Sequence, residues 1–154
     1  MTMLAAKRPV RMRIFGDWRL AAALSLAPLF WLALSFSQNG ASARWSGNAS
    51  AFVLVVLVFP VLEEIVFRGA VQDFLGRHLE VRNTSGLTRA NLATSVLFAA
   101  AHVALRGSPF SAAVFFPSLV FGYFRERHGT LASPILLHVF YNAGLFLIFG
   151  VPPR

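Results

Sequence analysis

The feature that most limits how this chain can fold is an unbroken apolar run, residues 51–62, that leads directly into charged residues. Glu63, Glu64 and Arg68 follow this run closely. Burying a charged side chain in such surroundings costs several kcal/mol unless the charge is paired. On a helix, Glu64 and Arg68 lie on one face at i and i+4 and can pair, whereas Glu63 points about 100° away from Glu64. The spacing therefore predicts one neutralised carboxylate and one that needs another partner.

The composition indicates a membrane protein. Of the 154 residues, 56% are hydrophobic, 16 are phenylalanine and only 13% are charged, whereas about 25% of the residues in an average soluble domain are charged. We therefore expect an all-α fold, a polytopic membrane helical bundle. The net charge of +8 is no sign of nucleic-acid binding, because the basic residues flank apolar segments and no nucleic-acid motif is present. The absence of cysteine excludes disulfides, thiolate metal sites and cysteine nucleophiles.

Apolar segments divide the chain into about five transmembrane helices. A basic cytoplasmic N-terminal segment, 1–19, precedes a single membrane domain, 20–150. The expected helices cover 20–36, about 51 to 78, 92–105, 110–124 with a kink at Pro117, and a last helix that Thr130 or Ser133 caps and that ends near Gly150. Ala41-Ser42-Ala43 resembles a cleavage site, so a cleaved signal peptide is the alternative for the first segment. Its apolar part is longer than an ordinary signal-peptide core, which favours an uncleaved span.

The distribution of basic residues predicts that the N-terminus is cytoplasmic. With this orientation the outer side holds only Arg44, Arg106 and Arg154. The inner side holds Lys7, Arg8, Arg11, Arg13, Arg19, Arg68, Arg77, Arg82, Arg89, Arg125 and Arg127. Such an excess on one side is the positive-inside pattern of integral membrane proteins. We expect an integral protein of the bacterial inner membrane, in contact with membrane lipid.

Three further polar residues interrupt apolar helices. His102 lies in the third expected helix, and His138 and Asn142 share one face of the last. From a rise of about 1.5 Å per residue and a hydrocarbon core of about 30 Å, Glu63 lies roughly 10 Å, His102 roughly 16 Å and His138 roughly 6–12 Å above the inner surface. All fall between the midplane and the cytoplasmic side, and ionisable groups there indicate function.

A carboxylate, two imidazoles and an amide at this depth favour hydrolysis. Glu63 is the expected general base, and His102 is expected to help hold and deprotonate a water. His138 and Asn142 are donors that can stabilise the oxyanion of a tetrahedral intermediate. Glu64 with Arg68 would support the site. No serine or threonine stands beside a histidine in the sequence in a way that favours a nucleophilic triad. His78 and His128 lie in predicted surface segments and receive no role.

Other interpretations of the same residues remain open. In a zinc-dependent version, Glu63, His102 and His138 would bind the metal and leave a fourth position for water. Neither histidine belongs to an H-E-x-x-H pair, and Glu64 would then have to be the base, so no metal cofactor is favoured. Buried histidines, asparagines and Glu–Arg pairs also serve as structural contacts between membrane helices. A non-catalytic immunity or scaffold protein and a proton relay are therefore the rival functions.

Three motifs together resemble those of a known family. Glu63-Glu64-x-x-x-Arg68, Phe98-x-x-x-His102 and His138-x-x-x-Asn142, in that order, are similar to the motifs of the CPBP family, the type II CAAX prenyl proteases and bacteriocin-processing (Abi) proteins. The resemblance covers roughly residues 52–149.

The resemblance implies an intramembrane glutamic endopeptidase. It implies that Glu63 and His102 activate the water, that His138 and Asn142 form the oxyanion site, and that Glu64 and Arg68 support them. The expected substrate is a membrane-associated protein or peptide, such as a C-terminal tail, a sorting signal or a bacteriocin-type precursor.

Overall fold

The computed structural model describes residues 14–37, 49–79 and 87–150, and these residues form only helices and the turns between them. The expected all-α fold is therefore confirmed for this part of the chain. Most of the basic N-terminal segment and the cleavage-site resemblance at 41–43 lie outside the described residues, as do residues 80–86.

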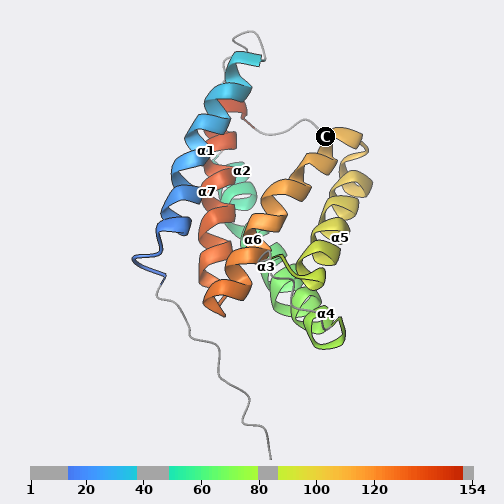
Figure 1. The fold of residues 1–154 in the computed structure, drawn as a ribbon. Helices are drawn as coiled ribbons and strands as arrows, with labels where there is room; N and C mark the ends of the chain where they lie inside the picture. The colour runs from blue at the N-terminus through green and yellow to red at the C-terminus, as the bar shows by residue number, and fades with distance from the viewer. Residues whose placement is uncertain (1–13, 38–48, 80–86, 151–154) are drawn as a thin grey trace, which may run out of the picture.

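The helices run alternately up and down and pack side by side (Figure 1). In chain order they are α1 (Trp18–Ser37), α2 (Ala49–Phe52), the π-helix η1 (Val53–Val58), α3 (Phe59–Glu64), the π-helix η2 (Ile65–Val71), α4 (Gln72–His78), α5 (Arg89–Arg106), the 3₁₀ helix η3 (Pro109–Val114), α6 (Phe115–His128) and α7 (Ala132–Phe149). Helices α2 to α4 form one continuous rod. The helix α7 packs against α1, α3 and α6, and α5 packs against α4 and α6.

Two helices in the described residues are long and apolar enough to cross a membrane. They are the rod Ala49–His78, with 30 residues, and α7, with 18 residues, and a shorter apolar helix covers Trp18–Leu32. Large apolar side chains also face outward along these helices, including Leu62 and Leu147, which are more than half exposed. Exposed apolar surfaces of this kind are typical of surfaces that contact a membrane or another protein. About five spans and a cytoplasmic N-terminus stay predictions.

The helix boundaries around α6 differ from the expectation. The expected helix 110–124 begins instead as η3, and α6 starts only at Phe115. Pro117 therefore lies in the first turn of α6, where its missing N–H is not needed, rather than in a mid-helix kink. The helix also extends beyond the expected end at residue 124, since α6 continues to His128 and ends at Gly129 with a φ of 65°. Glycine adopts this left-handed conformation at little cost.

Ion pairs explain why α6 continues through its charged end. Arg125 binds both oxygens of Asp73 at 3.0 and 2.7 Å. Arg127 donates to Asp17, the residue before α1, and His128 Nε2 donates to the same carboxylate at 3.0 Å. Because these charges have partners on other helices, they need not turn out to solvent. The basic side chains in the last turn of α6 also interact favourably with the negative, C-terminal end of the helix dipole.

His128 is not the surface residue that the sequence predicts. Only 2% of it is exposed, and its Nδ1 lies 2.8 Å from the hydroxyl of buried Ser133. The hydroxyl of Ser133 also donates to the carbonyl of Phe124 at 3.5 Å. The Asp17–His128–Ser133 chain therefore joins the beginning of α1, the end of α6 and the beginning of α7. All three side chains are buried, which makes this chain a structural connection between helix ends.

We expect this connection to weaken in acid. The Arg127 guanidinium lowers the pKa of the Asp17 carboxyl from its ordinary 3.8 to about 2. A carboxyl whose pKa is lower in the folded state stabilises the fold above its ordinary pKa, and this contribution is lost as the pH falls through the folded value. The thermal midpoint should therefore fall between about pH 4 and pH 2. Asp17→Asn should have a lower midpoint at neutral pH and a weaker acid dependence. An equal acid dependence in both proteins would contradict this assignment.

Gly122 allows α5 and α6 to approach closely. A methyl group at Gly122 would overlap the side-chain amide of Asn91, which is fully buried. This amide cannot move aside easily, because its Nδ2 donates to the carbonyl of Leu119 at 3.0 Å. We expect Gly122→Ala to destabilise the protein by about 1–3 kcal/mol through overpacking. Gly76→Ala is the matched control, since its methyl group would meet only Ala90 at an ordinary 4.0 Å. Comparing the thermal midpoints of both variants tests this, and equal midpoints would refute it.

Candidate active site

Both carboxylates of the candidate site stand at the end of α3, between two π-helical segments. Glu63 and Glu64 are the last residues of α3, with η1 before it and η2 after it. In a π-helix each backbone N–H bonds five residues back, which widens the helix locally. The amide of Phe59 bonds to the carbonyl of Leu54, and that of Gln72 bonds to the carbonyl of Phe67. Such widened turns change the directions of the side chains that follow, and they are frequent at functional sites.

Glu64 forms the ion pair with Arg68 that the spacing predicts. Arg68 Nη1 lies 3.0 Å from Glu64 Oε1, and both side chains are fully buried. The guanidinium is placed between two aromatic rings, with its Cζ 4.8 Å from the ring centre of Phe98 and 5.5 Å from that of Phe121. The second nitrogen, Nη2, donates to the hydroxyl of Ser118 at 2.6 Å and to its carbonyl at 3.0 Å. Arg68 is thus held by the carboxylate of Glu64, by the two aromatic rings and by Ser118.

A hydrogen-bonded series of buried polar side chains continues from Arg68 through Ser118. The hydroxyl of Ser118 donates to Ser95 at 3.0 Å, and Ser95 in turn donates to Asn91 Oδ1 at 3.3 Å. The sequence interpretation missed these residues. A signal was present, because Asn91, Ser95, Phe98 and His102 recur at the spacing of one helical face. This face of α5 turns toward α6 and the rod.

His138 lies between the two carboxylates. Its Nδ1 is 2.8 Å from Glu64 Oε1, and its Nε2 is 3.6 Å from Glu63 Oε2. The ring stacks on Phe121 with centroids 4.8 Å apart and meets Phe98 edge-on at 5.9 Å. Only 5% of His138 is exposed. The structure therefore brings together residues of the first and third motifs, which are far apart in the sequence.

The contacts of His138 define which of its nitrogens carries hydrogen. Glu64 Oε1 accepts from both Arg68 and His138, so His138 Nδ1 is the donor. In the neutral ring, Nε2 then has only a lone pair, and it faces the Glu63 carboxylate. The pair of Glu63 and His138 Nε2 can therefore hold a single proton between them. A shared proton at a partly exposed carboxylate suits general acid–base chemistry.

His102 presents a free nitrogen to the same region. Its Nδ1 lies 3.0 Å from the carbonyl of Phe98 and must donate to it, so Nε2 of the neutral ring is an acceptor. The ring packs on Phe98 with centroids 4.4 Å apart. His102 is half-buried, and it interacts electrostatically with Glu63 and His138. An acceptor in this position can receive a hydrogen bond from a water near Glu63.

Asn142 faces the widened rod. It lies one helical turn after His138 on α7, and its Nδ2 donates to the carbonyl of Val55 in η1 at 3.0 Å. A π-helical segment disturbs the regular backbone bonding, and Asn142 satisfies one carbonyl there. Its second amide hydrogen remains available to another acceptor.

In the zinc-dependent alternative, the expected metal ligands are Glu63, His102 and His138. Among the residues that the structure describes, no three histidine or acidic side chains are grouped in a way that could hold a metal ion. His138 instead directs one nitrogen to Glu64 and the other to Glu63.

Comparison with known proteins identifies the family. No curated protein and no solved structure matches this chain. A family model described as type II CAAX prenyl endopeptidase Rce1-like matches residues 44–144, which is well over half of the chain. The match includes all three motifs and confirms the resemblance to the CPBP proteases. Because this match covers residues 44–144, the chain belongs to the Rce1-like family of membrane-embedded type II CAAX endopeptidases.

Proposed function

We propose that this protein hydrolyses a peptide bond in a membrane-associated protein or peptide, with Glu63 activating the attacking water. The observation that carries the proposal is the position of His138 between Glu63 and Glu64 inside an apolar group of helices. The two carboxylates differ in environment. The side chain of Glu63 is 31% exposed, whereas that of Glu64 is fully buried and paired with Arg68. Glu63 is therefore the carboxylate that can meet a water.

In the proposed reaction, Glu63 removes a proton from the water while the water oxygen attacks the peptide carbonyl. The acceptor nitrogen of His102 holds the second hydrogen of this water. The tetrahedral intermediate carries an oxyanion, which the remaining amide hydrogen of Asn142 stabilises together with His138 when its Nε2 is protonated. The C–N bond then breaks, and the proton held by Glu63 and His138 passes to the leaving amine.

Glu64 and Arg68 would position His138 rather than touch the substrate. The Arg68 guanidinium directs Glu64 Oε1 toward Nδ1, and Ser118 holds the guanidinium. Each of these groups is fully buried. This arrangement fixes the orientation of His138 before the substrate binds, which lowers the cost of reaching the transition state.

The proposed substrate is a tail or precursor segment that reaches the cytoplasmic half of the bacterial inner membrane. This location rests on the predicted topology of about five spans with a cytoplasmic N-terminus, which would put Glu63 and the histidines below the midplane. C-terminal tails, sorting signals and bacteriocin-type precursors have hydrophobic segments that can enter there. The family description, a type II CAAX prenyl endopeptidase, supports the hydrolysis of a peptide bond.

A cleavage assay distinguishes the proposed function from its rivals. We expect the full chain, reconstituted in vesicles, to cleave a tail-anchored test peptide, and Asn142→Ala to lower the rate by about 10²–10³-fold because one oxyanion donor is lost. A proton relay predicts pH-dependent flux that survives Asn142→Ala. A scaffold or immunity protein predicts that cleavage is absent and that the cellular phenotype of the wild type persists in Asn142→Ala.

Chelation tests the zinc-dependent alternative. If Glu63 acts as a general base, removing divalent metals from the purified protein should leave the cleavage rate unchanged. Loss of activity in chelator that added zinc restores would favour Glu63, His102 and His138 as metal ligands instead.

A further inference from the structure

A groove runs along the outer surface between α1, α6 and α7, away from the candidate active site residues. Its volume is about 350 Å³, within the range of ligand sites. Apolar side chains form most of its lining, among them Ala22 and Leu26 of α1 and Val120 of α6. Tyr141 of α7 lines it as well, and its hydroxyl donates to the carbonyl of Ala23. The groove is therefore an apolar depression on the outer surface of three helices.

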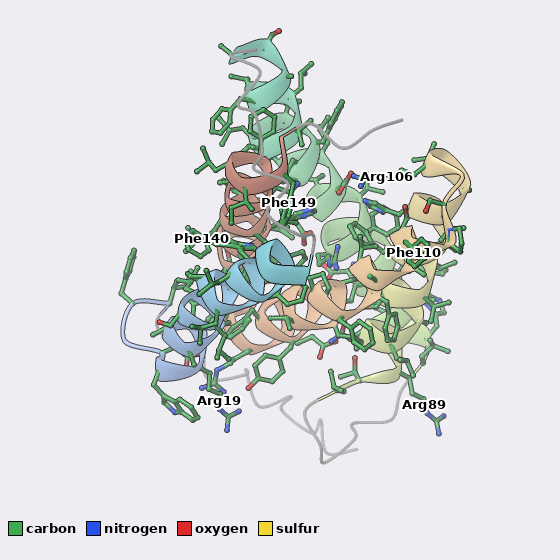
Figure 2. All side chains as sticks on the ribbon, turned by 90° about the horizontal axis from the view of Figure 1, so that it is seen from above. Arg19, Arg89, Arg106, Phe110, Phe140 and Phe149 are labelled. Atoms are coloured by element: carbon green, nitrogen blue, oxygen red, sulfur yellow. The ribbon has the colours of Figure 1, made fainter. Side chains whose placement is uncertain are left out.

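Of the described residues that line this groove, Arg19 carries the positive charge. The guanidinium of Arg19 lies over the Trp18 ring at 5.5 Å and donates to the hydroxyl of Tyr123. Among the described residues, Arg19 has no carboxylate partner for its side chain, although its backbone amide bonds to Asp17. Arg19 is exposed and points outward at the edge of the view in Figure 2. A guanidinium has several N–H donors in a plane, so most of its capacity for an anion is still available.

We propose that this groove binds an anionic phospholipid, with the headgroup phosphate on Arg19 and an acyl chain along the apolar walls. The walls need an apolar occupant and the arginine needs an anion, and one lipid molecule supplies both. Tryptophan, tyrosine and arginine are the residues that anchor proteins at the membrane interface. Arg19 also lies on the side that the basic residues predict to be cytoplasmic, where basic pockets between helices bind anionic headgroups.

Two side chains, Tyr141 and Phe121, separate the groove from His138 of the candidate active site. Tyr141, in the groove, packs against Phe121 with ring centroids 5.5 Å apart, and Phe121 stacks on His138 at 4.8 Å. The lipid would therefore stabilise the packing of α1 on α7 beside the site. The proposal does not depend on the cleavage reaction, since lipid binding is measured without a substrate.

Retention of lipid by the purified full chain tests the proposal. The protein is taken from vesicles containing equal amounts of phosphatidylglycerol and phosphatidylcholine, and the retained lipids are counted by native mass spectrometry. We expect the wild type to prefer phosphatidylglycerol, and Arg19→Gln to reduce this preference about fivefold. Arg89→Gln is the matched control, because Arg89 is equally exposed at the same edge of the view but lies on α5, away from the groove (Figure 2).

A second variant tests the apolar part of the groove without changing the charge. Ala22→Phe fills the groove with an aromatic ring, and we expect it to reduce the retention of both lipids while α1 remains apolar. Equal losses of phosphatidylglycerol preference in Arg19→Gln and Arg89→Gln would show only a diffuse attraction to surface charge and would overturn the proposal. Unchanged lipid retention in Ala22→Phe would also overturn it, because the acyl chain would then lie elsewhere.

Discussion

Replacing Glu63 by glutamine is expected to lower the cleavage rate by about 10²–10⁴-fold, the range for removing a general base, with little change in thermal stability. The glutamine keeps the size of the side chain but cannot accept the proton of water. Glu63 is partly exposed, and its Oε2 lies 3.6 Å from His138 Nε2. The folded state therefore depends little on its charge. The measurement is the initial rate of peptide cleavage in vesicles, with the thermal midpoint determined on the same preparation.

Glu64→Gln is the matched control for this result. The two carboxylates are neighbours in the chain, but Glu64 is fully buried and accepts hydrogen bonds from Arg68 and His138. We expect Glu64→Gln to lower both the thermal midpoint and the rate, since Arg68 loses its ion-pair partner. If Glu63→Gln remained active while Glu64→Gln was stable and inactive, the roles of the two carboxylates would have to be exchanged.

Removing the charge of Arg68 is expected to have the largest effect on stability. Arg68→Met would leave the buried Glu64 carboxylate without its cation, which typically costs about 3–5 kcal/mol. The methionine fills part of the space between Phe98 and Phe121, so the loss reflects the unpaired charge more than a cavity. The measurement is the shift of the unfolding midpoint in detergent, relative to the wild type.

A double variant separates the ion pair from packing. In Arg68→Met with Glu64→Gln both charges are absent, and we expect the double variant to be more stable than Arg68→Met alone. Such non-additivity is the signature of two residues in direct contact. Arg68→Lys should not restore full stability, because an ammonium group cannot bind Glu64 and Ser118 in the planar arrangement of the guanidinium. Additive effects of the two single changes would contradict the buried pair.

Spacing along one helix was enough to predict the local pairs. Glu64 and Arg68 at i and i+4 do form an ion pair, because such residues share a helical face whatever surrounds them. The order of the three motifs also predicted the family, which the family match confirms. The apolar composition predicted helices, because helices satisfy their own backbone in lipid.

The spacing of residues along the sequence could not predict which side chains of different helices contact each other. The spacing of the motifs did not predict that His138 of α7 lies 3.6 Å from Glu63 and 2.8 Å from Glu64. That Glu63 and His102 together activate a water stays a prediction. Two π-helical segments flank the carboxylates and change the direction of the residues after them. A periodicity of 3.6 residues cannot anticipate such widened turns.

The sequence by itself determined that the chain is helical and that its composition suits a membrane. It also identified the two adjacent carboxylates, Glu63 and Glu64, and the motif histidines, His102 and His138. Only the tertiary structure decided that Ser118 holds Arg68 and that His128 is buried against Asp17. The physical reason is that periodicity defines which residues share a face of one helix. How that face is rotated toward its neighbours depends on the packing of all the helices together, as at Gly122 and Asn91.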